Sequence, residues 1–217
     1  MEFFAKIATS LDGKIALEDG QSKWISCEES RKFVHQLRSK ADIIATGIGT
    51  ILADDAQLSA RDGETLYPNQ PQRVVFDSNA RTPINSKILQ NTKKPTIIFH
   101  GENASEFRLE KLNNAGAITK NIDINQDGEI NIIEAYKALS FLGAKSIMLE
   151  AGSILLSNCI ASGVINRLYW FRAPIIMGNK AKDVFNGLNP ESLDKAKKLR
   201  LIEIKKIGTD ILEIYEV

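Results

Sequence analysis

The chain has 217 residues, of which 43% are hydrophobic and 25% are charged, and its formal net charge is +1. These values suit one domain with a sizeable core, and they give no indication of nucleic acid or an acidic membrane surface as a partner. No apolar run approaches the roughly 20 residues that span a bilayer. Cys27 and Cys159 stand far apart without a CxxC spacing, so we expect free thiols and a cytoplasmic location.

The first half of the chain predicts strands that alternate with short helices. Asp12-Gly13 is a turn signal between two alternating runs, which predicts a hairpin. The S-x-x-E spacing of Ser26 and Glu29 is typical of a capping box and predicts a helix start there. In chain order, we expect strands at 3–9 and 14–17, a loop at 20–25, a helix from 26 to about 40, a strand at 42–46, a turn at 47–50, a short helix at 51–53 and a polar connector at 58–72.

The second half continues this alternation and ends in two runs joined by a Gly-Thr pair. In chain order, we expect strands at 73–76, 96–100, 117–122, 146–149 and 164–171, helices at 105–114, at 130–142 and from 154 onward, and an antiparallel hairpin of 199–207 and 210–217. Strands that alternate with helices favour an α/β fold with a mostly parallel central sheet and helices on both faces. Without internal repeats or an obvious linker, we expect a single domain over residues 1–217.

The segment from Asp123 to Glu134 has the D-x-[DN]-x-[DN]-G-x5-E spacing of an EF-hand calcium loop. An EF-hand needs a helix on each side, and the residues before Asp123 predict a strand instead. We therefore interpret the segment as a polar turn in which Gly128 supplies a positive φ, with calcium binding as the alternative. The chain has only two histidines, and we expect no metal site.

Two glycine turns follow predicted strands, and each opens a predicted helix. The first contains Gly47, Gly49 and Thr50, and the second contains Gly152 and Ser153. Free N–H groups and the helix dipole favour an anion at such a place, so the two turns could hold the two phosphates of a dinucleotide. Neither turn has the G-x-G-x-x-G spacing of the usual Rossmann fingerprint, and close packing of a helix on a strand is the alternative for each.

Ser78 and Arg81 follow the strand predicted at 73–76. A hydroxyl and a guanidinium at this place suit a monoester phosphate, such as the 2′-phosphate that distinguishes NADP from NAD. An Asx-type turn with a solvated arginine is the alternative.

Five further polar residues are candidates for substrate chemistry. Arg38 and Arg61 suit a phosphate through bidentate contacts, with surface ion pairs as the alternative. Lys6, Asp54 and Glu150 could move a proton near a reacting carbon. No Ser-His-Asp arrangement is evident.

Seven segments, taken together and in order, resemble one family. They are ATSLDGKIA, SKWIS, ADIIATGIGTILADDAQLSAR, RVVFDSNAR, the turn at Asp127-Gly128, SIMLEAGS and LYWFRAPIIMG. The chain resembles, over nearly its whole length, the NADPH-dependent 5-amino-6-(5-phosphoribosylamino)uracil reductases of riboflavin biosynthesis, in bacteria often the C-terminal half of a bifunctional deaminase–reductase. The resemblance implies a dihydrofolate-reductase-like fold, NADPH as the cofactor, a phosphoribosylaminopyrimidine substrate and a homodimer.

Matching positions assign site residues by the same resemblance. The implied NADPH contacts are Ala8, Trp24, Thr50, Asp54, Ser78, Gly152, Ser153, Ile154, Leu155, Leu156, Ser157 and Asn158, to which we add Gly47 from its turn and Arg81 from its charge. The implied substrate contacts are Ser22, Arg38, Leu58, Arg61 and Glu150, with Lys6 near the ribosyl chain. For catalysis, the candidates that would assist sugar opening and protonation of nitrogen are Lys6, Glu150 and Asp54.

The chain departs from the family in two respects. Ala151 replaces a glycine of the usual E-G-G turn, which is tolerable if φ there is negative. The zinc deaminase signature H-x-E…P-C-x-x-C is absent from the sequence, so we expect a reductase domain without the deaminase domain, either beside a separate deaminase or as part of a longer chain. A related pteridine or dihydrofolate-type reductase and a catalytically inactive nucleotide-binding paralogue are the alternative functions.

Overall fold

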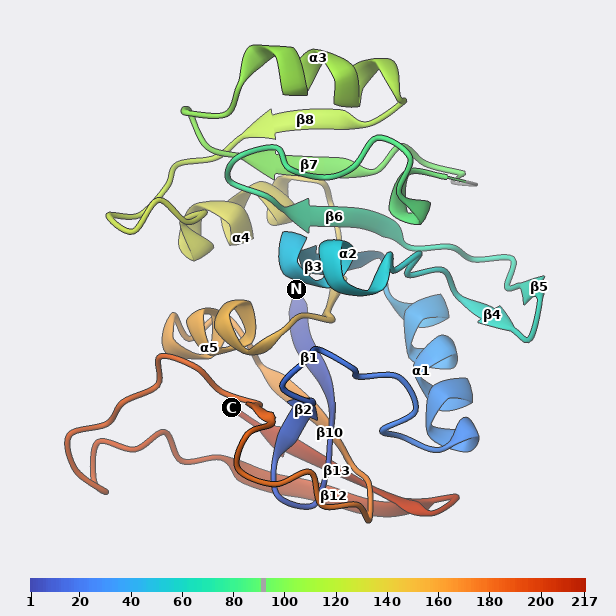
Figure 1. Ribbon diagram of the computed structural model, residues 1–217, viewed down its shortest axis with the longest axis vertical. Helices are drawn as coiled ribbons and strands as arrows, with labels where there is room; N and C mark the ends of the chain where they lie inside the picture. The colour runs from blue at the N-terminus through green and yellow to red at the C-terminus, as the bar shows by residue number, and fades with distance from the viewer. Residues whose placement is uncertain (91–92) are drawn as a thin grey trace. The chain divides into compact units, whose positions relative to one another are not determined.

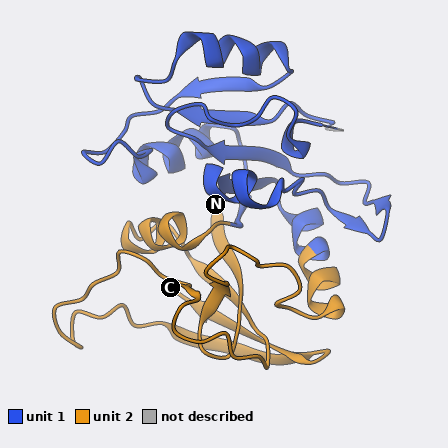
Figure 2. Cartoon of the chain, viewed as in Figure 1, with its two compact units in different colours: residues 1, 35–150 blue, residues 2–34, 151–217 orange. Residues whose placement is uncertain are grey.

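The computed structural model describes residues 1–90 and 93–217, which group into two compact units (Figure 2). Unit 1 comprises Met1 and residues 35–150, and unit 2 comprises residues 2–34 and 151–217. Helix α1 (Glu28–Lys40) is divided between them after Val34. In the described ranges, no helix has the length and apolar character that crossing a bilayer requires. The single domain expected from the sequence stays a prediction.

Parallel strands form the sheet of unit 1 (Figure 1). They lie in the order β9-β3-β6-β7-β8, and every neighbouring pair is parallel. Successive side chains such as Val74 and Val75 are both 0% exposed, as expected for parallel strands covered on both faces. The predicted mostly parallel α/β sheet is therefore confirmed. The bounds are β3 (Ile43–Gly47), β6 (Gln72–Phe76), β7 (Ile97–His100), β8 (Ile118–Asn121) and β9 (Ser146–Leu149).

Three helices lie close to the predicted positions, namely α2 (Ile48–Asp54), α3 (Glu106–Asn114) and α4 (Ile132–Phe141). The 3-10 turn η1 (Lys87–Leu89) was not predicted. The side chain of Asn131 caps α4 by accepting from the amides of Ile133 and Glu134. Before it, Asn125 Oδ1 accepts from two amides of its own turn, and Gly128 has a φ of +76°. The predicted polar turn is thus confirmed.

The connector at 58–72 is less polar than predicted. Leu58, Ser59 and Ala60 are 5%, 1% and 0% exposed, and a short hairpin follows them, made of β4 (Arg61–Asp62) and β5 (Thr65–Leu66). The side-chain amide of Gln70 accepts from the N–H of Ala60 and donates to its C=O. These two bonds satisfy the main-chain groups of Ala60, which pairs with no strand of a sheet.

The sheet of unit 2 is mixed, in the order β12-β13-β10-β1. β1 and β10 are parallel, and the other two pairs are antiparallel. The predicted terminal hairpin is confirmed as β12 and β13, while β10 begins three residues later than the predicted strand. The bounds are β1 (Glu2–Thr9), α5 (Ser153–Ala161), β10 (Arg167–Arg172), β12 (Arg200–Ile207) and β13 (Asp210–Glu216).

The predicted hairpin of 3–9 and 14–17 is wrong in its pairing. The turn is present, since the amide of Ser10 donates to the carbonyl of Lys14 at 2.9 Å. However, β2 (Lys14–Ala16) pairs with β11 (Lys182–Asp183) in a separate two-stranded sheet. The carboxylate of Asp12 provides the reason, because it accepts from the amides of Met177 and Gly178 and so holds the segment that leads into β11.

The predicted capping box at Ser26 and Glu29 is also replaced. Helix α1 begins at Glu28, and a carboxylate 183 positions away, that of Asp210, accepts from the amide of Cys27 at 2.8 Å. The same oxygen accepts from the Ser30 hydroxyl at 2.6 Å. Asp210 is 1% exposed and is the first residue of β13, so the turn of the terminal hairpin holds the start of α1.

Candidate active site

The carboxyl ends of three adjacent strands form the first part of the candidate site, in unit 1. β3 ends at Gly47, Asp77 follows β6, and Glu150 follows β9. β9 is the last of the unit 1 strands along the chain but pairs with β3, so the strand order reverses direction there, which is where open α/β sheets bind ligands. The hydroxyl of Thr46 donates to the main-chain carbonyl of Glu150 at 2.6 Å and joins the two strand ends.

Two predicted substrate residues, Arg38 and Glu150, form a buried ion pair. Arg38 Nε lies 2.5 Å from Glu150 Oε1, and Arg38 Nη2 lies 3.0 Å from Oε2. Their side chains are only 15% and 8% exposed. Two parallel charge-assisted bonds fix the planes of both groups. A substrate would therefore meet a rigid ion pair and not an isolated arginine.

Helix α2 carries the predicted cofactor residues of unit 1. The helix already begins at Ile48, with Gly47 as its extended N-cap, so most of the predicted turn at 47–50 is helical. Gly47, Thr50 and Asp54 are spaced i, i+3 and i+7 and so share one face, while Ile48 and Ile51 are buried. Thr50 is half-buried and Asp54 is exposed.

The segment after α2 places Leu58 and Arg61. Leu58 is buried with a φ of +53°, a left-handed conformation that side-chain sterics disfavour. Arg61 Nη1 donates to Gln57 Oε1 at 3.0 Å and approaches Ser59 Oγ at 3.4 Å. Because the charge of Arg38 is balanced by Glu150, Arg61 supplies the positive charge of this segment that favours an anionic ligand.

A tight loop after β6 carries Ser78 and Arg81. Asp77 is fully buried, and its Oδ2 accepts from the amide and the hydroxyl of Thr82, both at 2.7 Å. Asp77 Oδ1 lies 4.0 Å from Arg81 Nε, and the Arg81 side chain is 50% exposed. Ser78 is half-buried. The side chain of Asp77 therefore holds this loop, and Ser78 and Arg81, which we predict to contact a phosphate, lie on it.

Unit 2 carries the remaining predicted contacts. Lys6 and Ala8 are half-buried on one face of β1, two residues apart. In the loop before α1, Ser22 is half-buried and Trp24 is 74% exposed with a φ of +72°. The guanidinium of Arg31 lies 4.5 Å from the centre of the Trp24 ring and orients it by a cation–π contact.

The glycine turn after β9 opens helix α5 in unit 2. Gly152 is the extended N-cap, and the first i to i−4 bond runs from Leu156 N to Gly152 O. The earlier amides of the helix have no acceptor within it and can donate to a ligand. Leu156 and Ser157 are 2% and 1% exposed, and the Ser157 hydroxyl accepts from the amide of Asn186. Their side chains thus serve the core of unit 2.

Comparison with known proteins identifies the family. Residues 3–212 match the family described as RibD C-terminal domain. The chain belongs to this family. It is 33% identical to the 2,5-diamino-6-ribosylamino-4(3H)-pyrimidinone 5′-phosphate reductase of Methanothermobacter thermautotrophicus, over 97% of this chain and 95% of the relative.

Solved structures support the fold of this RibD C-terminal domain. RibD of Acinetobacter baumannii superposes with a TM-score of 0.82 at 25% identity, over 99% of this chain and 57% of that one. Dihydrofolate reductase of Enterococcus faecalis superposes with a TM-score of 0.51 at 13% identity, over 99% and 95%, which shows the fold alone. The dihydrofolate-reductase-like fold is confirmed. The chain covers only 56% of the length of several curated RibD proteins that it matches.

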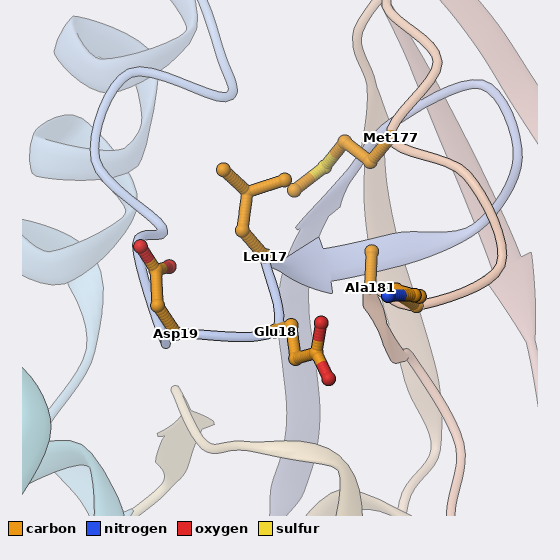
Figure 3. A pocket seen from close by; sticks show the side chains of 6 residues that line it. Leu17, Glu18, Asp19, Met177 and Ala181 are labelled. Atoms are coloured by element: carbon orange, nitrogen blue, oxygen red, sulfur yellow. The ribbon is translucent and has the colours of Figure 1, made fainter.

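A cavity of about 460 Å³ lies in unit 2, and none of the residues that line it is a predicted site residue (Figure 3). Leu17, Glu18 and Asp19 line one side, and Met177, Lys180 and Ala181 line the other. The Asp12 carboxylate shapes it by binding the amide of Met177. The Ser10 hydroxyl and these amides lower the pKa of Asp12 to about 2, so the carboxylate stays charged.

Sequence reasoning missed the residues that support the ion pair. Ser59 accepts on its main-chain oxygen from Arg38 Nη1 at 3.1 Å, and His35 Nδ1 lies 3.0 Å from the same oxygen. The i, i+3 spacing of His35 and Arg38 on a helix was a signal for a shared face. Nothing in the sequence indicated that a buried carbonyl would face them. Ala151 is not among the described residues with a positive φ, so its substitution for glycine is tolerated.

Proposed function

We propose that the protein is an NADPH-dependent reductase of riboflavin biosynthesis that converts the ribosyl group of 5-amino-6-(5-phosphoribosylamino)uracil to the ribityl group. The family match over residues 3–212 supports the reductase class. The observation that carries the proposal is the Arg38–Glu150 pair at the reversal of the parallel sheet, because it presents fixed hydrogen-bonding groups where this fold binds ligands.

The donor groups of the chain fit a phosphate-bearing dinucleotide. Helix α5 offers the amides of its first turn, and α2 offers the half-buried Thr50 hydroxyl on the face that also carries Gly47 and Asp54. The exposed guanidinium of Arg81, beside Ser78, suits a monoester phosphate and supports NADPH over NADH. The further contacts that we assign to the cofactor are Ala8, Trp24, Gly152, Ser153, Ile154, Leu155, Leu156, Ser157 and Asn158.

The proposed substrate is a phosphate monoester, which suits the positive charge of Arg61, and we also assign the paired guanidinium of Arg38 to this substrate. Glu150 is held by Arg38 and would accept hydrogen bonds from the pyrimidine or the ribose. We assign Ser22 and Leu58 to the same substrate. Because Leu58 is 5% exposed, its main chain is the better candidate for contact.

NADPH, when bound, supplies a hydride to C1′ of the ring-opened sugar. The protein must first promote cleavage of the C1′–O4′ bond, in which O4′ gains a proton and a C1′=N bond forms. It must then keep a proton on the nitrogen while C1′ accepts the hydride. Lys6, Asp54 and Glu150 are the candidates for these proton transfers.

We also propose a cytoplasmic homodimer in which residues 1–217 act as one reductase domain. The eight-residue strand β12 lies at the edge of the unit 2 sheet, with Leu201, Ile202 and Ile204 between 46% and 57% exposed. A long apolar edge of this kind favours pairing with a second chain. Burial raises the pKa of the Cys159 thiol to about 12, which suits a reduced cysteine of the core.

Oxidation of the reduced nicotinamide tests the proposal. NADPH absorbance should fall when the deaminated ribosylaminopyrimidine phosphate is added, more slowly with NADH and not at all with a dihydropterin. Turnover of the dihydropterin would instead indicate a pteridine reductase. Binding of NADPH without turnover of either substrate would indicate an inactive paralogue.

A further inference from the structure

The main-chain oxygen of Ser59 links helix α1 to the segment that carries Arg61 by hydrogen bonds. Ser59 is 1% exposed, and its carbonyl accepts from Arg38 Nη1 at 3.1 Å, with His35 Nδ1 at 3.0 Å. On its other side, the hydroxyl of Ser59 lies 3.4 Å from Arg61 Nη1. A continuous set of polar contacts therefore runs from His35 through Ser59 to Arg61.

This segment needs external support. Leu58 immediately precedes Ser59 and has a φ of +53°, a strained conformation that persists only where the surroundings hold it. Gln70 fixes the far side by bonding the N–H of Ala60 at 3.0 Å and its C=O at 2.7 Å. The two donors on the Ser59 carbonyl fix the near side.

The imidazole of His35 is a neutral donor in this arrangement. A carbonyl oxygen can only accept, so the proton of the ring must sit on Nδ1. Burial, followed by the positive charge of Arg38, lowers the pKa of His35 to about 4, which keeps the ring uncharged near neutral pH. Arg38 Nη1 lies 3.5 Å from the same nitrogen, and two donors cannot bond each other, so both point to Ser59.

We propose that His35 is a positioning residue, which through the Ser59 carbonyl holds left-handed Leu58 and sets the Arg61 guanidinium for the phosphorylated substrate. The proposal rests on the proposed function in assigning Arg61 to the substrate. The positioning itself does not depend on that assignment. His35 belongs to none of the residue sets predicted from the sequence.

Two substitutions of His35 separate a hydrogen-bond role from packing. His35→Asn keeps an N–H donor at nearly the position of Nδ1, whereas His35→Leu keeps a similar volume without any donor. Gln36→Leu, at the exposed neighbouring position of α1, is the matched control. Loss of one neutral hydrogen bond corresponds to about a tenfold effect, so His35→Leu should raise KM for the ribosylaminopyrimidine phosphate about tenfold.

The other constants should change little. We expect kcat of His35→Leu to stay within about twofold and its NADPH affinity to be unaltered, and His35→Asn to recover most of the change in KM. Unchanged KM in a folded His35→Leu protein would overturn the proposal, as would equal losses in both variants or an effect confined to kcat.

Hydrogen exchange provides a second readout that needs no activity. Peptides covering residues 57–67 should exchange faster in His35→Leu than in the wild type, and His35→Asn and Gln36→Leu should match the wild type. Equal exchange in all four proteins would overturn the positioning role. Wild-type protein that exchanges as expected but never oxidises NADPH would instead refute the proposed function and leave the positioning role supported.

Discussion

Removing the guanidinium of Arg38 should be strongly destabilising, because it leaves the buried carboxylate of Glu150 without that cation. The two side chains are 15% and 8% exposed and share two charge-assisted bonds, so this pair belongs with buried ion pairs. Breaking one partner of such a pair costs about 3–5 kcal/mol. Arg38→Met keeps most of the apolar stem, so we expect about 3 kcal/mol of lost stability, measured by urea unfolding followed by circular dichroism.

The double variant distinguishes the loss of an ion-pair partner from the loss of packing. Replacing both residues by Met leaves neither the carboxylate without the guanidinium nor the guanidinium without the carboxylate, so Arg38→Met with Glu150→Met should be clearly more stable than either single variant. Lys137→Met, which breaks the exposed Lys137–Glu134 pair, should have a much smaller effect. Strictly additive losses in the double variant would refute this reasoning.

Three further predictions concern stability, pH and the cofactor. Asp210→Ala should lower the free energy of unfolding in urea by about 2 kcal/mol, because the amide of Cys27 and the buried hydroxyl of Ser30 lose their acceptor. Asp210→Asn keeps an acceptor oxygen and should retain most of the stability. Equal losses in the two variants would contradict the capping role. The pKa of His35 is lowered from 6.5 to about 4 in the folded protein, so the unfolded chain binds more protons between these two pH values. The free energy of unfolding should therefore fall by about 2 kcal/mol from pH 7 to pH 5. His35→Asn should lose that part of the pH dependence, and an unchanged slope would contradict the assignment. Arg81→Ala should weaken NADPH binding about tenfold in a fluorescence titration without altering the affinity for NADH, and equal weakening of both would remove Arg81 from the 2′-phosphate.

The parallel half of the fold was predictable because its strands are short, apolar and separated by helices. Ile43 to Thr46 and Ile97 to Phe99 read as buried runs, and both become neighbours of β6. Turn chemistry was equally informative where it is local. Gly128 adopts the positive φ that its Asp-Gly turn requires, and Asn131 caps the helix that follows.

Most of the missed features depend on partners far along the chain. Local residue types predicted the turn at Asp12. The strand that pairs with Lys14–Ala16 is instead determined by hydrogen bonds from the amides of Met177 and Gly178 to the Asp12 carboxylate. The start of α1 depends on Asp210, which no local pattern near Ser26 indicates. In the candidate site, the residue types were predictable, whereas the pairing of Arg38 with Glu150 depends on tertiary structure across 112 positions.

Transfer of deuterium from reduced cofactor to product tests the central claim most directly. The protein should be incubated with NADPH deuterated at C4 of the nicotinamide and with 5-amino-6-(5-phosphoribosylamino)uracil, and the product examined by mass spectrometry. We expect a ribityl product that carries one deuterium at C1′ when the label is on the transferred face. A product without deuterium from either labelled face, or no ribityl product at all, would contradict the account.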